Sequence, residues 1–174
     1  WLLRFLLFRL MFASGVVKLA SDDPTWWNLS ALRVHFETQP LPTWIGWYAH
    51  RLPEWFQKTS VAIMYLVELA VPFFMFLPRV CRLAGFFVLA GFQVLILLTG
   101  NYCFFNALTI VLCVSLADDG LFRRLPGRLA PRATPDPPVP RDPRAKTVLT
   151  WAFAALVFVL SAWQLVDMFS PSPR

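Results

Sequence analysis

Residues 61–100 have the sequence VAIMYLVELAVPFFMFLPRVCRLAGFFVLAGFQVLILLTG. About 20 apolar residues are enough for a helix to cross the roughly 30 Å of hydrocarbon in a bilayer. Two such lengths fit here, at 60–78 and 81–99, and a short turn with proline and arginine separates them. This stretch therefore predicts two transmembrane helices that follow one another directly.

Three more apolar runs surround this pair, at 1–20, 102–117 and 147–169. Of the 174 residues, 57% are apolar and 15% are charged, whereas about a quarter of the residues in an ordinary soluble domain are charged. We therefore expect an all-α membrane protein, built as a bundle of about five transmembrane helices. The third and fourth helices meet at 99–101 and should form a tight antiparallel hairpin.

The basic residues indicate which helix ends face the cytoplasm. Arg79 and Arg82 follow the second span, and a larger group follows the fourth, namely Arg123, Arg124, Arg128, Arg132, Arg141, Arg144 and Lys146. Cytoplasmic loops are enriched in Lys and Arg, so residues 21–59 should lie on the opposite, outer side. We predict a membrane core at 1–119 with an outer cap at 21–59, a disordered Pro- and Arg-rich cytoplasmic linker at 120–146, and a last transmembrane helix with a short outer tail at 147–174.

Polar side chains inside the spans fall at similar depths. At about 1.5 Å per helical residue they lie roughly 8–16 Å from the outer helix ends, and the residues of this intramembrane polar layer are Arg9, Glu68, Gln93 and Asn106, with Asn101 at the outer turn. A lone Arg in hydrocarbon costs at least about 3 kcal/mol, so we predict that Arg9 pairs with Glu68. The alternative is a polar lock that fixes helix packing and binds nothing. Lys18, nearer the outer surface, is expected to extend its amine toward water.

Pro72 lies four residues after Glu68. Its ring removes the amide that would bond to the Glu68 carbonyl, so the second span should kink at this point. The kink would open the helix beside the only carboxylate of that span.

The predicted cap is rich in aromatic residues, which collect at membrane interfaces, so we expect it to lie on the membrane. Prolines at 40, 42 and 53 divide it into short pieces. One piece, Trp44 to Arg51, is a plausible surface helix on which Trp47, Tyr48 and Arg51 share a face. The residues we expect to contact a client protein are Trp44, Trp47, Tyr48 and Trp55.

Five blocks of the chain together resemble the lipase maturation factor family. They are FRLMFASGVVKL at 8–19, DPTWWNLSAL at 23–32, HFETQPLPTWIGWYAHRLPEWF at 35–56, VELAVPFFMF at 67–76 and LTGNYCFFNALTI at 98–110. The resemblance implies a multi-pass protein of the endoplasmic reticulum membrane that helps lipases such as lipoprotein lipase to fold and be secreted. The family's N-terminal spans and lumenal C-terminal domain are absent from this chain, which begins with Trp1, so we expect a fragment or processed product.

Three functional interpretations follow. The favoured one is a non-enzymatic maturation or assembly factor whose partners are membrane lipid and a secreted client, a lipase among them. The alternative is a membrane enzyme, distantly similar to carboxylase and oxidoreductase families, with Lys18, His35, Glu37 and Asn106 as candidate catalytic groups. A transporter is disfavoured because no inverted repeat is visible.

Other sites are not indicated by the sequence. His35 and His50 are fifteen residues apart with no Cys near them, so we expect no metal site but structural imidazoles, bonded to backbone or to Glu37. We expect no cofactor and no nucleic acid. Abundant Arg and Pro indicate a high-GC genome. If the source is a bacterium, the protein would lie in the inner (plasma) membrane. In a eukaryote it would lie in the endoplasmic reticulum, where Asn28-Leu29-Ser30 would be a glycosylation sequon.

Overall fold

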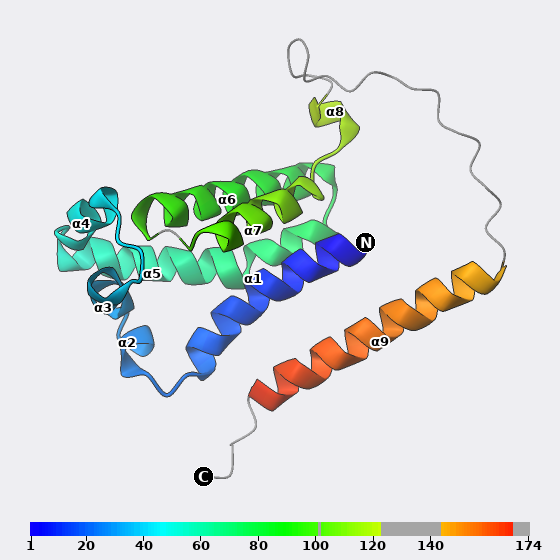
Figure 1. Cartoon of the computed structure of the whole chain (residues 1–174), viewed down its shortest axis with the longest axis horizontal. Coiled ribbons are helices and arrows are strands. Elements are labelled where there is room, and N and C mark those ends of the chain that lie inside the picture. The colour runs from blue at the N-terminus through cyan, green and yellow to red at the C-terminus, as the bar shows by residue number, and fades with distance from the viewer. Residues whose placement is uncertain (101, 123–143, 169–174) are drawn as a thin grey trace. The chain divides into compact units, whose positions relative to one another are not determined.

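The computed structural model describes residues 1–100, 102–122 and 144–168 (Figure 1). This described part is helical and contains no strand, which confirms the predicted all-α fold. The chain divides into two compact units, one holding Leu3–Ala117 and the other holding Asp118–Arg174. Asn101 and most of the predicted linker, 123–143, lie outside the described residues.

Within the first unit, the helices follow one another with short connections. The first unit contains α1 (Leu2–Ala20), α2 (Pro24–Trp27), α3 (Ala31–Thr38), α4 (Trp44–His50), α5 (Glu54–Leu69), the 3-10 helix η1 (Val71–Phe76), α6 (Arg79–Thr99) and α7 (Phe104–Val114). The second unit contains α8 (Asp119–Phe122) and α9 (Arg144–Met168).

Two helical stretches are long and apolar enough to cross a membrane, Glu54–Phe76 and Arg79–Thr99. They correspond to the second and third predicted spans and indicate a membrane protein. The apolar stretches Phe104–Val114 and Thr150–Gln164 are shorter, and α1 carries three cations in 19 residues. The other three spans therefore stay predictions.

The second span changes its helix type at the position that the sequence predicts. The α-helical part ends at Leu69, and a 3-10 helix continues from Val71. Because Pro72 has no backbone N–H to donate, the α-helical hydrogen bond to the Glu68 carbonyl cannot form. This span begins six residues before the predicted residue 60, since Pro53 precedes the first turn and Lys58 pairs with Glu54 at 2.8 Å.

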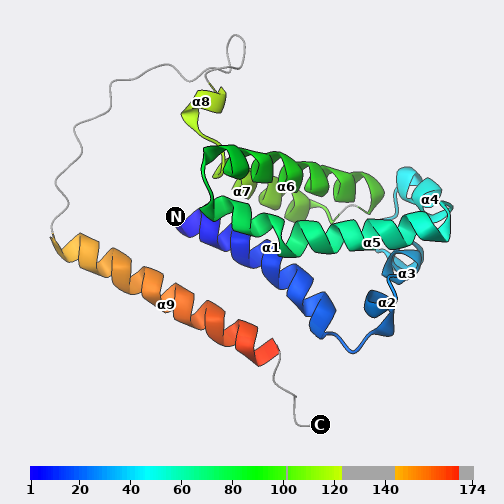
Figure 2. The same ribbon diagram turned by 180° about the vertical axis from the view of Figure 1, so that it is seen from behind.

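The antiparallel α6–α7 hairpin is also confirmed. Near the turn, Asn106 Nδ2 donates to Gln93 Oε1 at 2.9 Å, and at the far end Arg82 Nε donates to the Leu116 carbonyl at 3.1 Å. Both views show α6 and α7 beside α5, with α3 and α4 gathered at the N-terminal end of α5 (Figure 1 and Figure 2). The cap helices therefore cover one end of the bundle.

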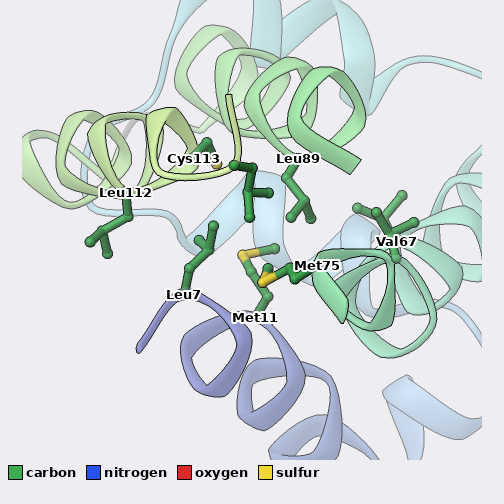
Figure 3. Close-up of a cluster of buried hydrophobic side chains, with 9 residues drawn as sticks. Leu7, Met11, Val67, Met75, Leu89, Leu112 and Cys113 are labelled. Carbon is green, nitrogen blue, oxygen red and sulfur yellow. The ribbon is translucent and has the colours of Figure 1, made fainter. Parts of the chain in front are cut away.

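The core of the first unit lies where α1, α5, η1, α6 and α7 meet. Its buried side chains include Leu7, Met11, Val67, Met75, Leu89, Leu112 and Cys113, which point toward one another in Figure 3. Leu7 and Met11 are four residues apart on α1 and therefore share one helical face. That face also carries Ser14, Gly15 and Lys18, so the core packing sets the direction of the polar groups described next.

Candidate functional site

The cap (residues 21–59) is attached to the C-terminal end of α6 by side-chain hydrogen bonds. Thr43 Oγ1 donates to the Leu98 carbonyl at 2.6 Å, and Gln39 Nε2 donates to the Thr99 carbonyl at 3.3 Å. The last carbonyls of a helix have no partner within the helix. The cap therefore supplies the donors that this helix end lacks.

The helix predicted from Trp44 to Arg51 is confirmed as α4, Trp44–His50, and it is held at both of its ends. At its start, Thr43 Oγ1 accepts from the Gly46 amide at 2.9 Å. At its end, the buried Gln57 of α5 donates through Nε2 to the carbonyls of His50, at 2.7 Å, and Leu52, at 3.2 Å. The helix is thereby fixed to α6 on one side and to α5 on the other.

A buried ion pair joins α1 to α5. Lys18 Nζ lies 2.6 and 2.8 Å from the two carboxylate oxygens of Glu68, and also donates to Ser14 Oγ at 2.9 Å. The side chains of Lys18 and Glu68 are 18% and 5% exposed. Such burial makes the two charges dependent on each other, because an unpaired charge in this position would be costly.

This pair corrects the prediction that Arg9 binds Glu68. Arg9 and Lys18 are nine residues apart, or about 2.5 helical turns, so they lie on opposite faces of α1. Lys18 shares the inward face with Met11, whereas Arg9 is half-buried elsewhere and is not among the partners of the carboxylate in the described residues. The expectation that Lys18 extends its amine toward water is also wrong, because the side chain is 18% exposed and its ammonium bonds to Glu68.

Gly15 allows α1 to approach α5 closely at this pair. A Cβ at this position would lie 2.7 Å from Leu69 Cδ2 and 3.2 Å from Glu68 Cβ. The cap covers the pair from outside, since the Trp26 ring centroid lies 5.6 Å from Lys18 Nζ. The ion pair thus connects α1, α5 and the cap.

A second buried network involves the α6–α7 hairpin. Asn106 donates to Gln93, as described above, and accepts from the Tyr102 amide through Oδ1 at 2.7 Å. Gln93 Nε2 lies 3.6 Å from Met11 Sδ. Three members of the predicted polar layer, Glu68, Gln93 and Asn106, are therefore buried, but they belong to two separate networks.

Each of the two histidines connects two segments: His50 joins α4 to α3, and His35 joins α3 to Tyr102. His50 Nε2 of α4 lies 3.3 Å from Glu37 Oε1 of α3, in agreement with the predicted structural imidazole. The His35 ring stacks on Tyr102, with Nδ1 3.5 Å from the phenol oxygen. Burial, and then the positive charge of Lys18, lower the pKa of His35, so its imidazole is neutral at neutral pH.

The four candidate catalytic groups thus bond to different partners. Lys18 binds Glu68, Glu37 binds His50, Asn106 binds Gln93, and His35 contacts Tyr102. Each bond holds two elements together. Within the described residues, no group of three His, Cys, Asp or Glu side chains is placed to hold a metal ion.

Several residues of this region were not found by sequence reasoning. Ser14 could have been found, because it precedes Lys18 by one helical turn. Tyr102 links the hairpin network to the cap, through its amide to Asn106 and its ring to His35. Gln39, Thr43 and Gly46 contact backbone atoms of α6 that are more than fifty residues away in sequence, and no local pattern reveals such contacts.

Acidification is expected to weaken the attachment of α3. The docked state holds the pKa of His35 below its ordinary value of 6.5, so the undocked state binds protons more readily. The stability of docking is therefore complete above pH 6.5 and is lost as the pH falls through that value. Hydrogen exchange of residues 31–39 at pH 7.5 and 5.5, corrected for the intrinsic rate, should show faster exchange at the lower pH. His35→Phe should lose this dependence, and an unchanged dependence would refute the assignment to His35.

Comparison with known proteins adds to this geometry. Residues 1–124 match the family described as the lipase maturation factor transmembrane domain. Lipase maturation factor 2 of Gallus gallus is 60% identical over 129 residues, which are 74% of this chain and 18% of the relative. The Homo sapiens relative of the same name is 49% identical over 157 residues, covering 90% and 20% of the two chains.

A more distant relative is lipase maturation factor 1 of Mus musculus, 40% identical over 119 residues, which are 68% of this chain and 21% of the relative. The chain spans about a fifth of the length of these three curated relatives. No solved structure matches the chain significantly.

Proposed function

Because this chain belongs to the lipase maturation factor family, we propose that it acts as a membrane-bound factor that assists the folding and secretion of lipases. The match over residues 1–124 carries this proposal, since it includes the cap and all helices of the first unit. The relatives named above come from animals. This origin favours the endoplasmic reticulum membrane as the location, with the cap on the lumenal side.

We place client contact at the exposed aromatic residues of the cap. Trp44, Trp47, Tyr48 and Trp55 are 76%, 52%, 61% and 67% exposed. Large aromatic side chains are common at protein contacts because they bury much apolar area with few rotatable bonds. The polar groups behind them are engaged in bonds between elements, which favours a binding role over a catalytic one.

Secretion from cells tests this function. Cells that express lipoprotein lipase and lack this protein should secrete less active lipase, while a secreted non-lipase is unaffected. The full-length protein should restore secretion, and a variant with alanine at Trp44, Trp47, Tyr48 and Trp55 should restore several-fold less. A matched control is alanine at the exposed Phe87 and Leu95 of α6, outside the cap. Normal lipase secretion without the protein would contradict the proposal.

A further inference from the structure

The exposed side of α4 carries a continuous stripe of large side chains. Trp44, Trp47, Tyr48 and Arg51 follow the i, i+3, i+4, i+7 spacing of one helical face, and all four are exposed. The opposite side carries Gly46, which is buried against Thr99. A surface helix normally buries its apolar face. Here the aromatic face is left outside because the glycine side makes the contact with α6.

This surface, the α4 face, is held in a fixed conformation before any partner arrives. Its helix is bonded through Thr43 to α6 and through Gln57 to α5. Trp47 and Tyr48 also pack edge to face, with ring centroids 5.0 Å apart. A preformed surface loses little conformational entropy on binding, which favours recognition of a partner.

Arg51 gives the α4 face an available positive charge. Its guanidinium carbon lies 3.7 Å from the centroid of the Trp47 ring. Neighbouring acids of the cap are paired elsewhere, Glu37 with His50 and Glu54 with Lys58. Among the described residues, Arg51 has this cation–π contact and no ion pair. A guanidinium stacked by its flat face keeps its edge N–H groups for a carboxylate.

We propose that the α4 face binds an apolar segment of the immature client that carries a carboxylate. The rings of Trp44, Trp47 and Tyr48 would contact the apolar side chains, and Arg51 would pair with the carboxylate. Trp, Tyr and Arg are the residue types that contribute most at binding surfaces. This inference rests on the proposed function and gives it a specific client chemistry. Phospholipid headgroups offer a phosphate at the membrane surface, and the experiment below separates them from a client.

Photocrosslinking tests the assignment in membranes that contain the full-length protein. A benzophenone amino acid at position 48 should crosslink to newly made lipoprotein lipase, whereas the same probe at Phe87 of α6 should not. Arg51→Glu should lower the crosslinked yield at position 48 on the order of fivefold, because it removes an exposed ion pair with the client carboxylate. Arg33→Glu, at an exposed arginine of α3, should leave the yield unchanged.

The outcomes distinguish this inference from the proposed function. Crosslinks from position 48 to phospholipid but not to lipase would overturn the inference and make the α4 face a membrane anchor. Full lipase secretion with Arg51→Glu and with Trp44→Ala would also overturn it, while the proposed function stands if secretion still requires the protein. If Arg51→Glu lowers the amount of folded protein, Trp44→Ala provides the same test. Lipase secretion that does not depend on the protein would instead refute the proposed function.

Discussion

Gly46→Ala is expected to separate α4 from the C-terminal end of α6. The added Cβ would lie 2.3 Å from the Thr99 carbonyl oxygen and 3.0 Å from Gln39 Nε2. Because the first of these atoms belongs to the backbone of a long helix, no side-chain rotation can relieve the overlap. Overpacking usually costs about 1–3 kcal/mol, and a backbone overlap belongs at or above the upper end of that range. The hydrogen bonds from Gln39 and Thr43 to α6 should be lost with it.

Limited proteolysis in membranes measures this separation. Trypsin should cut after Arg51 and Lys58 several-fold faster in Gly46→Ala than in the unchanged protein. Gly91→Ala is the matched control, because nothing lies within 4 Å of its Cβ position in α6. That change should leave cleavage as it is, and the added helix propensity is worth up to about 1 kcal/mol. Equal cleavage of the two variants would show that α4 does not sit against Thr99.

The second large effect concerns the Lys18–Glu68 pair. Glu68→Leu leaves the Lys18 ammonium partly buried without its carboxylate, and Lys18→Met leaves a carboxylate that is 5% exposed without its cation. Breaking a buried pair from one side costs about 3–5 kcal/mol, whereas replacing both partners by apolar groups is often neutral or stabilising. We therefore expect both single variants to unfold at clearly lower temperature, and the double variant to recover most of the loss.

Thermal unfolding of the purified full-length protein in detergent provides the double-mutant cycle. Arg9→Met serves as the control cation, because Arg9 is on the opposite face of α1; its effect should add to that of Glu68→Leu without coupling. Glu54→Gln, which breaks the exposed pair with Lys58, should change little. A Lys18→Met/Glu68→Leu variant as unstable as the sum of its single changes would refute the pairing.

Features that depend on one helix at a time could be predicted from the sequence. The two long spans follow from apolar length, the change at Val71 follows from the missing amide of Pro72, and α4 follows from its position between prolines. The identity of the partner of Glu68 could not be predicted from depth. Depth gives the position along a helix but not the rotation around it, and rotation decides between Arg9 and Lys18.

The rotation of α1 was nevertheless encoded in the chain. Leu7, Met11, Gly15 and Lys18 repeat at helical spacing, and the first two enter the core. The attachment of the cap had no such signal, because it joins Thr43 to a carbonyl at Leu98 and Gln39 to one at Thr99. Backbone carbonyls are present at every residue, so only the folded chain shows which of them remain without partners.

The attachment of the cap to the last carbonyls of α6 also sets an order of assembly. A ribosome completes residues 21–59 well before it reaches Leu98 and Thr99, so the cap helices are made before the helix end that holds them. Until the α6–α7 turn has been translated, α4 has only its neighbours in the cap and at the start of α5. The C-terminal end of α6 is therefore the last of the elements holding α4 to be synthesised, and α4 gains these contacts only after it.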